Sequence, residues 1–318
     1  MGGRTLVQWE QNRDNAPGSL TVDLYAGGPA PDSGLDEVTF YQVPYAPSTQ
    51  GVDARLDMIA RMPSLEVVQL LSAGYEQVLP LLPDSVTLCN GRGLHDASTA
   101  EHALALILAA QRDLPRWALA QREHHWGSAQ LRSLADSRVV IVGYGSIGQA
   151  VESRLLPFEA EVVRVASRAR PDEDVHGVDE LHALLPGADI VVLVTPLTDA
   201  TRGLFGAREF ALLRDDALVV NVGRGPVLDT GALLAEKGRV RAALDVTDPE
   251  PPPADHPLWS APGVFLTPHI AGGSAAFYPR ARAFMDAQLA RWAAGERLAN
   301  VVRPGPPPAG GGRDSSGH

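Results

Sequence analysis

The stretch Arg138-Val-Val-Ile-Val-Gly143-Tyr-Gly145-Ser-Ile-Gly148-Gln-Ala-Val151 decides the fold of this chain. A run of four apolar residues leads directly into Gly-x-Gly-x-x-Gly, and helix-compatible sequence follows as far as Leu156. In a strand–turn–helix context this pattern predicts a site for the pyrophosphate of a dinucleotide, with an ordinary tight turn as the alternative. The first glycine permits the turn, the second lets the backbone approach the phosphates, and the third lets helix and strand pack closely, while the N–H groups at the helix start face the anion. The residues expected at the pyrophosphate are Gly143, Gly145, Ser146, Ile147 and Gly148.

Composition limits the class of protein. The chain has 318 residues, enough for two domains, with 45% hydrophobic residues and a mean hydropathy of −0.05. No apolar run reaches the roughly 20 residues that span a bilayer, and the start of the chain lacks the apolar core of a signal peptide, so we expect a cytoplasmic protein that binds no membrane. The net charge of −11 argues against a nucleic-acid-binding surface. The single cysteine, Cys89, excludes an internal disulfide, fits a reducing cytoplasm and is expected to be a small buried side chain rather than a nucleophile.

The first third of the chain predicts a small α/β unit with a parallel sheet. Short β-type runs alternate with Pro- and Gly-rich connections and one helical segment. Ligands of such sheets bind at the carboxyl ends of the strands, so the turn Ser72-Ala73-Gly74 is a candidate substrate contact, with a plain strand-to-helix turn as the alternative. The predicted strands are 20–26, 38–43, 65–71 and 86–90, and the predicted helix is 53–62.

Two helices are expected before the glycine turn. Residues 98–113 are Ala, Leu and Ile on nearly every side, which predicts a helix buried all round, between domains or at a subunit interface. Residues 113–126 predict a second helix, broken by Pro115. It ends in His124, His125 and Trp126, but adjacent histidines do not share a helix face, so we predict no metal site.

After the glycine turn, apolar strands recur at the intervals of a doubly wound sheet covered on both faces. The strands are expected at 162–166, 190–194, 217–222, 242–246 and 264–267, and the helices between them at 179–185, 207–213 and 229–236. An amphipathic helix is expected over 274–295. From Arg303 the Pro- and Gly-rich tail predicts a flexible end.

The end of the second strand of this sheet bears on the choice of cofactor. Residues 161–166 run into Ser167-Arg168-Ala169-Arg170, and no carboxylate follows until Asp172. In dinucleotide folds a carboxylate at this point binds the ribose 2′-OH of NAD, whereas a hydroxyl and a guanidinium suit a 2′-phosphate. We therefore predict that NADP(H) is preferred, through Ser167 and Arg168, and that NAD(H) can also be used. The alternative is that the arginines form a solvated loop and either cofactor serves equally.

Three later strand ends carry candidate catalytic groups, at 221–225, 245–251 and 267–272. Reduction of a 2-oxo acid needs an arginine to hold the carboxylate with two hydrogen bonds and a histidine to protonate the carbonyl oxygen as hydride arrives. A carboxylate on the other ring nitrogen fixes the tautomer. Arg224, Glu250 and His269 could fill these roles, but each has a structural alternative: a surface turn, a solvated loop and a helix cap, respectively.

The chain resembles the D-isomer-specific 2-hydroxyacid dehydrogenase family along nearly its whole length, and the end of its second nucleotide-domain strand resembles the glyoxylate/hydroxypyruvate reductase branch, which favours NADPH. The matching residues are Ser72-Ala73-Gly74, Ala100-Glu101-His102, Gly143-Tyr-Gly-Ser-Ile-Gly148, Thr195-Pro-Leu-Thr198, Thr201-Arg-Gly203, Asn221-Val-Gly-Arg-Gly225, Leu244-Asp-Val-Thr-Asp-Pro-Glu-Pro251 and Pro268-His269. The resemblance implies a Rossmann dinucleotide-binding domain, 98–274, with a smaller flavodoxin-like α/β substrate domain, 1–97 and 275–303, and a disordered tail, 304–318. Its implied activity is the NAD(P)H-dependent reduction of a small 2-oxo acid to the D-2-hydroxy acid.

The resemblance also implies roles for particular residues. Arg224 binds the substrate carboxylate, His269 is the acid/base and Glu250 pairs with His269. The backbone around Ala73 and Gly74 touches the substrate. The remaining residues implied at the nicotinamide half of the cofactor are Thr195, Val222, Gly223, Asp245 and Gly272.

Some features depart from the family pattern or leave alternatives open. The segment Leu233–Val240 is shorter than usual and Ala271 replaces a frequent glycine, but neither removes a catalytic group. Glu250 counts against a formate dehydrogenase, which has glutamine there, whereas a phosphite dehydrogenase remains an alternative. A dinucleotide-sensing corepressor without turnover is the alternative function from another class of protein.

The family and the helix at 99–111 suggest a homodimer through the nucleotide domain. The aromatic residues considered for the substrate pocket, with the core as the alternative, are Trp126, Phe277 and Tyr278.

Overall fold

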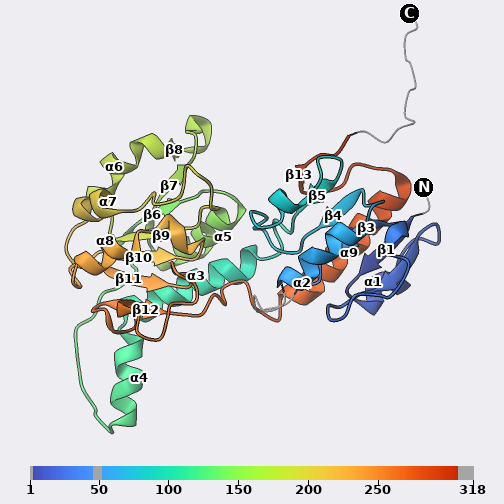
Figure 1. The fold of residues 1–318 in the computed structure, drawn as a ribbon. Helices are drawn as coiled ribbons and strands as arrows, with labels where there is room; N and C mark the ends of the chain where they lie inside the picture. The colour runs from blue at the N-terminus through green and yellow to red at the C-terminus, as the bar shows by residue number, and fades with distance from the viewer. Residues whose placement is uncertain (1–2, 46–51, 307–318) are drawn as a thin grey trace, which may run out of the picture. The chain divides into compact units, whose positions relative to one another are not determined.

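The computed structural model describes residues 3–45 and 52–306, and the chain forms two compact units. The central unit is His95–Ala275, and the terminal unit combines Met1–Leu94 with Ala276–His318. Each unit has its own sheet (Figure 1). The sequence places the boundaries at 97/98 and 274/275. Most of the predicted tail, residues 307–318, lies outside the described residues.

The central unit contains the doubly wound parallel sheet that the sequence predicts. Its order is β12-β11-β10-β9-β6-β7-β8, and every pair of neighbours is parallel. Read from β6, this is the Rossmann order with one additional edge strand, and the strand order reverses between β6 and β9. The strands are β6 Arg138–Val142, β7 Glu161–Ala166, β8 Val175–Gly177, β9 Ile190–Leu193, β10 Leu218–Asn221, β11 Arg241–Leu244 and β12 Val264–Leu266.

Helices cover both faces of this sheet, which is why its strands are apolar at successive positions. In β6, Val139 and Ile141 pack in one core cluster with residues of α3 and α5. Val140 and Val142 point the other way and pack in the cluster that contains Phe205 and Phe210. The helices are α3 Asp96–Gln111, α4 Leu114–Arg122, α5 Ser146–Leu155, α6 Leu181–Leu184, α7 Ala207–Leu212 and α8 Thr230–Ala235.

Three details of the central unit differ from the sequence predictions. Pro115 does not break a helix: it lies in the first turn of α4, where its missing N–H has no helical partner to lose. The chain turns before it at Asp113, which has a φ of +51°. Helix α3 is not buried all round, because Ala105 is exposed. Strand β8 was not predicted, since its three residues form a strand only by pairing with β7.

The terminal unit has a six-stranded sheet in the order β13-β5-β4-β3-β1-β2. All neighbours are parallel except β13, which runs antiparallel to β5. The order β2-β1-β3-β4-β5 is that of flavodoxin, as the resemblance implies. The elements are β1 Arg4–Val7, α1 Glu10–Asp14, β2 Thr21–Leu24, β3 Val38–Gln42, α2 Val52–Asp57, β4 Val67–Gln69, β5 Thr87–Cys89, α9 Phe277–Ala294 and β13 Val301–Arg303.

The end of the terminal unit is more ordered than the sequence predicts. Instead of beginning a flexible tail, Arg303 ends β13, and its Nη2 donates to the carbonyl oxygen of Pro83 at 2.6 Å. The amide of Gly305 donates to Thr87 Oγ1 at 3.0 Å.

Cys89 is free and buried, and burial raises the pKa of its thiol to about 12, which fits a packing role. None of the helices in the described part of the chain has the length and apolar character of a membrane span.

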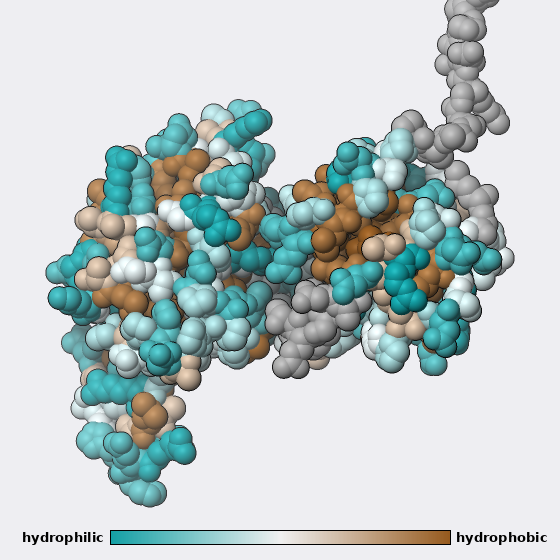
Figure 2. All heavy atoms as spheres, in the orientation of Figure 1, coloured by the Kyte–Doolittle hydropathy of each residue, from teal (hydrophilic) through white to brown (hydrophobic). Residues whose placement is uncertain are grey.

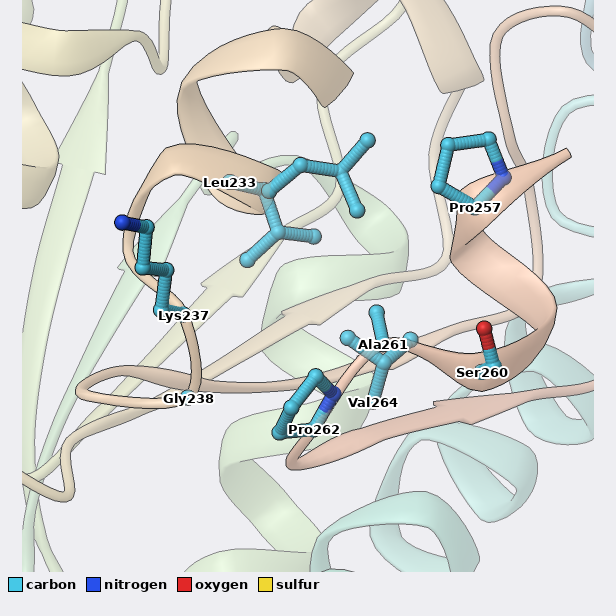
Figure 3. Close-up of a pocket in the computed structure, with 9 residues that line it drawn as sticks. Leu233, Lys237, Gly238, Pro257, Ser260, Ala261, Pro262 and Val264 are labelled. Carbon is cyan, nitrogen blue, oxygen red and sulfur yellow. The ribbon is translucent and has the colours of Figure 1, made fainter.

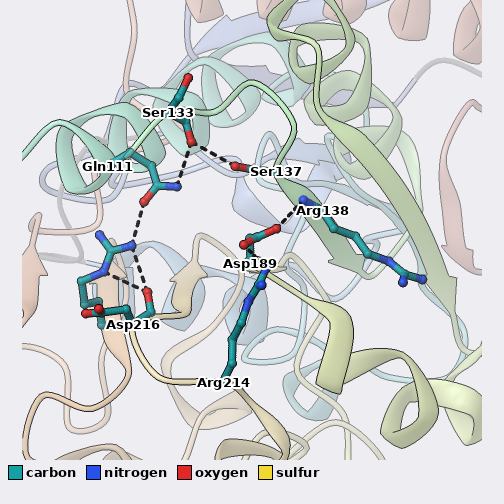
Figure 4. Close-up of polar contacts among 8 residues, drawn as sticks. Gln111, Ser133, Ser137, Arg138, Asp189, Arg214 and Asp216 are labelled. Atoms are coloured by element: carbon teal, nitrogen blue, oxygen red, sulfur yellow. Dashed lines mark hydrogen bonds and ion pairs between the residues drawn. The ribbon is translucent and has the colours of Figure 1, made fainter. Parts of the chain in front are cut away.

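Polar contacts hold the amino ends of the central strands (Figure 4), around a pocket of about 180 Å³ whose lining includes Gln111, Asp189 and Arg241. Arg241, at the start of β11, donates to the carbonyl oxygen of Ala110 at 3.0 Å and to Gln111 Oε1 at 2.7 Å, so it caps the C-terminus of α3. Burial, with a contribution from nearby Arg132, lowers the pKa of Arg241 to about 10. Asp189, before β9, accepts from the amide of Arg138 at 2.8 Å.

A cavity of about 380 Å³ also lies at this edge of the sheet (Figure 3). It is lined by Leu233 and Lys237 from the end of α8, and by Pro262 and Val264 at the start of β12. Ligands of open parallel sheets bind at the opposite, carboxyl edge. The candidate site is therefore built from the carboxyl ends of the same strands.

Candidate active site

The glycine turn between β6 and α5 has an open surface for a ligand. Gly143 has a φ of +107°, and a Cβ there would lie 2.7 Å from the carbonyl carbon of Val194. A Cβ on Gly148 would lie 2.9 Å from the carbonyl oxygen of Gly143, so this glycine is needed for close packing of α5 on β6. Beside Gly145, by contrast, a Cβ would meet no atom within 4 Å. The turn thus leaves room for phosphates at the N-terminus of α5.

Three strand ends meet around Thr195, at the point where the strand order reverses. A Cβ on Gly143 would lie 2.8 Å from the amide nitrogen of Thr195, and a Cβ on Gly223 would lie 2.8 Å from its carbonyl oxygen. Thr195 Oγ1 is buried and has no hydrogen-bond partner among the described residues. Val222 beside it is buried too. A dinucleotide lying across this switch point would pass these residues, and the unpaired hydroxyl fits a polar ligand group there.

The end of β7 presents Ser167 and Arg168 to solvent. Within residues 3–45 and 52–306, the Arg168 side chain has no hydrogen-bond or ion-pair partner. Asp172, the first carboxylate after the strand, lies in the 3₁₀ turn Pro171–Glu173. A free guanidinium with a neighbouring hydroxyl suits a phosphate.

The structure brings His269 and Glu250 into direct contact. The two residues follow neighbouring strands, β12 and β11, and His269 Nδ1 lies 2.5 Å from Glu250 Oε1. Both side chains remain partly exposed. A carboxylate on Nδ1 keeps a proton there, which leaves Nε2 for exchange with a substrate. The backbone of His269 has a φ of +52°, and its amide donates to the carbonyl oxygen of Asp245 at 2.8 Å.

Arg224 lies at the end of β10, beside the loops that carry this pair. Buried Asn221 holds the turn, because its Oδ1 accepts from the amide of Gly223 at 3.0 Å and its Nδ2 donates to the carbonyl oxygen of Arg224 at 3.0 Å. A Cβ on Gly225 would lie 1.8 Å from the carbonyl oxygen of Thr247, so a glycine is required where the two loops touch. The carboxyl ends of β10, β11 and β12 therefore place all three candidate catalytic residues along one edge.

Asp245 is a buried carboxylate that accepts several hydrogen bonds from within the protein. Its carboxylate is 0% exposed, and it accepts from Thr267 Oγ1 at 2.6 Å and from the amides of Ile270 and Ala271 at 3.0 and 2.8 Å. Burial alone would raise the pKa of Asp245, but the hydrogen bonds, including one from His102, outweigh burial and lower it. The sequence places Asp245 among the residues lining the nicotinamide. That placement stays a prediction, and in the structure the carboxylate of Asp245 holds the loop that carries His269.

His102 is a residue of this network whose role the sequence does not reveal. It projects from α3, and its Nε2 lies 3.0 Å from Thr267 Oγ1 and 3.3 Å from Asp245 Oδ1. His95, just before α3, similarly has Nδ1 3.2 Å from the carbonyl oxygen of Gly272. The sequence marks His102 only as part of the family-like motif Ala100-Glu101-His102, and this motif does not identify a hydrogen-bond partner in another loop.

Replacing Asp245 by asparagine should lower stability more at neutral than at acidic pH. The pKa of Asp245 is below its ordinary value of 3.8, so its contribution is present above that value and is lost as the pH falls through the lowered pKa. At pH 7, the amide NH₂ would face a backbone N–H, and we expect a loss of about 1–3 kcal/mol in the free energy of unfolding. Urea unfolding of the wild type and the variant at pH 7 and near pH 3 gives the difference between their free energies of unfolding. This difference should be smaller at the acidic pH.

The matched control for this experiment is Asp199→Asn, at an exposed position of the same unit. It should leave the free energy of unfolding unchanged at both pH values. An equal gap for Asp245→Asn at both pH values would show that the carboxylate charge is not what stabilises the loop.

In the terminal unit, the turn after β4 is held by side chains. Ser72 Oγ donates to the carbonyl oxygen of Gly74 at 2.8 Å, and Asn90 Nδ2 donates to that of Ala73 at 2.7 Å. The turn lies at the carboxyl end of its own sheet, and its role as a substrate contact stays a prediction. Among the aromatic residues considered for the pocket, Phe277 belongs to the core of this unit.

The histidine pair before the glycine turn lies on the surface of the central unit. His124, His125 and Trp126 are exposed, Trp126 fully so. Across the described ranges, no group of three or more His, Cys, Asp or Glu side chains is placed to hold a metal ion.

Comparison with known proteins agrees with this architecture. Residues 104–271 match the family model of the NAD-binding domain of D-isomer specific 2-hydroxyacid dehydrogenases. A glyoxylate/hydroxypyruvate reductase B from Escherichia fergusonii is 35% identical over 241 residues, which are 71% of this chain and 74% of the relative.

Two solved structures are similar over nearly the whole chain. A D-isomer specific 2-hydroxyacid dehydrogenase from Xanthobacter autotrophicus, in complex with NADPH and MES, has a TM-score of 0.77 at 31% identity and covers 95% of this chain and 98% of its own. An NADPH-dependent glyoxylate/hydroxypyruvate reductase from Sinorhizobium meliloti, in complex with NADP and sulfate, also has a TM-score of 0.77, at 27% identity, and covers 95% and 97%. The chain belongs to the D-isomer specific 2-hydroxyacid dehydrogenase family and is an oxidoreductase that uses a nicotinamide dinucleotide to interconvert a small 2-oxo acid and its 2-hydroxy acid.

Proposed function

We propose that this enzyme reduces glyoxylate, hydroxypyruvate or a phenylpyruvate-like 2-oxo acid to the D-2-hydroxy acid, with NADPH as the preferred cofactor. The observation that carries the proposal is the 2.5 Å contact between His269 Nδ1 and Glu250 Oε1, at the sheet edge that also carries Arg224. The relatives of similar sequence include glyoxylate/hydroxypyruvate reductases, which favours the smallest of these acids.

Each residue has one task in the proposed reaction. The guanidinium of Arg224 binds and orients the substrate carboxylate. His269 holds a proton at Nε2 and gives it to the carbonyl oxygen, and Glu250 stabilises the protonated ring and fixes its orientation. The reduced dinucleotide supplies the hydride when bound. We propose that its nicotinamide half is bordered by Thr195, Val222, Gly223, Asp245 and Gly272, and its pyrophosphate by the glycine turn.

A panel of 2-oxo acids tests this function. Loss of NADPH absorbance is followed with glyoxylate, hydroxypyruvate, pyruvate and phenylpyruvate, and the chirality of the products of pyruvate and phenylpyruvate is determined. Turnover to the D-acid supports the proposal. Dinucleotide binding without turnover of any acid would instead favour a sensor, and oxidation of phosphite with NADP⁺ would favour a phosphite dehydrogenase.

The NADPH preference rests on Ser167 and Arg168. Arg168→Asp should reduce the ratio of kcat/KM for NADPH to that for NADH by about 100-fold, because a favourable contact with the 2′-phosphate becomes a repulsion. Steady-state kinetics with both cofactors at a fixed, saturating 2-oxo acid give the ratio. Arg208→Asp, an exposed change on α7, is the control and should leave it unaltered. If Arg168→Asp left the ratio of kcat/KM for NADPH to that for NADH unchanged, Arg168 would not be the residue that binds the 2′-phosphate.

We also propose a homodimer formed through the central unit. Large apolar side chains are exposed on α4 and just beyond it, with Leu114 at 52%, Leu119 at 61% and Trp126 at 100%. Figure 2 shows some brown, hydrophobic surface among the teal of the projecting region that Figure 1 labels α4. Helix α4 projects from the sheet of its own unit (Figure 1), so these side chains have no core of their own to enter. An interface between two copies of this unit would cover such exposed apolar side chains.

Leu119→Arg should convert this dimer to a monomer, because a charge in an apolar interface is desolvated without a partner. Light scattering coupled to size-exclusion chromatography measures the mass. The exposed Leu156→Arg, outside α4, is the control and should stay dimeric. If the wild-type protein were monomeric at micromolar concentration, the proposed homodimer would be wrong.

We place the enzyme in the cytoplasm. Cys89, the one cysteine of the sequence, is buried and free. The fold thus depends on no disulfide and needs no oxidising compartment.

A further inference from the structure

Glu152 is a buried carboxylate that ties together three parts of the dinucleotide-binding motif. It lies on α5 and is only 7% exposed. Its Oε1 accepts from Arg164 Nε at 2.8 Å and pairs with Arg164 Nη2 at 2.7 Å, and its Oε2 accepts from the hydroxyl of Tyr144. Arg164 belongs to β7, and Tyr144 is the residue between the first two glycines of the turn. One carboxylate therefore joins the glycine turn, the helix after it and the second strand.

Two arginines enclose Tyr144 and extend this connection to the loop after β7. The guanidinium carbons of Arg164 and Arg170 lie 5.6 and 5.9 Å from the centroid of the Tyr144 ring. Arg170 Nη2 donates to the carbonyl oxygen of Tyr144 at 3.1 Å, and Arg170 Nε donates to Glu173 Oε2 at 2.9 Å. Arg164 Nη1 donates to the carbonyl oxygen of Glu173 at 2.9 Å. The backbones of Arg170 and Val175 pair as well, so both ends of the loop segment are fixed.

These contacts divide the two arginines of the loop into different roles. Arg170 is committed to Tyr144 and Glu173 and helps to shape the loop. Arg168, two residues earlier, is exposed and has no such partner among the described residues. A guanidinium carried on a pre-shaped loop loses less conformational freedom when it binds an anion, so its contact contributes more to affinity.

We propose that Glu152 is a positioning residue for cofactor selection. Through Arg164 and Tyr144 it holds the loop Ser167–Asp174 in the shape that presents Ser167 and Arg168 to a ribose 2′-phosphate. The inference rests on the proposed NADPH preference and adds to it a residue in the interior that never touches the cofactor. Tyr144 and Arg164 transmit the effect, and Arg168 makes the contact.

The test measures binding of two small probes to the full-length protein by calorimetry. Adenosine 2′,5′-bisphosphate carries the 2′-phosphate, and 5′-AMP lacks it. Glu152→Gln should weaken binding of the bisphosphate by about 10-fold, corresponding to 1.4 kcal/mol, and leave binding of 5′-AMP nearly unaltered. In kinetics, the ratio of kcat/KM for NADPH to that for NADH should fall with it. Glu161→Gln removes a surface pair with Arg138 at the other end of the same strands, and should change neither probe.

A double-mutant cycle separates positioning from general structural damage. If Glu152 acts mainly through Arg168, Glu152→Gln should weaken bisphosphate binding much less in an Arg168→Met background than in the wild type. Tyr144→Phe removes only the hydroxyl contact with Glu152, so it provides the same test if Glu152→Gln fails to fold, and a smaller loss of the same kind is expected. Equal losses for both probes, or an undiminished loss in the Arg168→Met background, would overturn the inference.

The outcomes also separate this inference from the function on which it rests. A wild-type protein that binds both probes equally overturns the NADPH preference and the positioning role together. A wild type that prefers the bisphosphate, with a Glu152→Gln variant that keeps the full preference, overturns the positioning role alone.

Discussion

Replacement of His269 by alanine is expected to reduce kcat for 2-oxo acid reduction by roughly 10³-fold, within the range that a positioned general acid contributes. The side chain is partly exposed and stands on a loop held by Asp245, so the variant should fold. Its loss removes the Nε2 proton from the carbonyl oxygen but no contact of the pyrophosphate turn. Stopped-flow or steady-state NADPH oxidation measures the rate, and calorimetry with NADPH should give an affinity close to that of the wild type.

A second His–Glu pair in the same unit provides a matched control. His182 Nε2 lies 2.6 Å from Glu209 Oε1, and the pair joins α6 to α7 rather than the loops that carry Arg224, Glu250 and His269. His182→Ala removes an equivalent pair and should leave kcat at the wild-type value. Glu250→Gln keeps a hydrogen-bonding group beside His269 but removes the charge, so its rate should lie between those of the wild type and His269→Ala. Wild-type turnover by His269→Ala would show that another group protonates the substrate.

The parts of the fold that the sequence predicts are those marked by local patterns. The run from Arg138 to Val151 has the apolar strand, the glycines and the helix within one short stretch, and β6 and α5 occur there. Strands β8 and β13 have three residues each and exist because they pair with distant partners, so no local pattern distinguishes them from loop. Pro115 has the same local signal at the start of a helix as inside one. The left-handed turn at Asp113 decides between them.

The same distinction holds for the site. Arg224, Glu250 and His269 each follow an apolar strand, so their place at one sheet edge follows from the topology. The contact of His102 with Thr267 joins residues 165 positions apart, and that of Glu152 with Arg164 joins β7 to α5 through side chains. Such pairs depend on helix rotation and on the register of packing. His102 lies in the motif Ala100-Glu101-His102, but the motif does not name its partner, and Glu152 lies in none of the quoted motifs.

Arg224→Gln is expected to raise KM for the 2-oxo acid by about 10³-fold, because two charge-assisted hydrogen bonds of about 1.5–3 kcal/mol each are lost. Within the described residues, the guanidinium has a single protein partner, the carbonyl oxygen of Gly223, at 2.8 Å from Nη1. Its other N–H groups are available to a carboxylate. Since the carboxylate is bound in both the ground state and the transition state, the change should appear mainly in KM rather than in kcat. Steady-state kinetics with glyoxylate or hydroxypyruvate separate the two constants.

The choice of substitution and substrate makes this prediction specific to the carboxylate. Arg224→Lys retains the charge but not the planar fork, so its KM should lie between those of the wild type and Arg224→Gln. Arg208→Gln, on α7, is exposed and should not alter KM. An uncharged aldehyde such as glycolaldehyde has no carboxylate to lose, so wild type and Arg224→Gln should reduce it with similar kcat/KM values. If the variant were equally impaired with the aldehyde, Arg224 would be acting on the carbonyl or on the shape of the loop. The assignment of the carboxylate to this guanidinium would then be wrong, while that of the proton to His269 would stand independently.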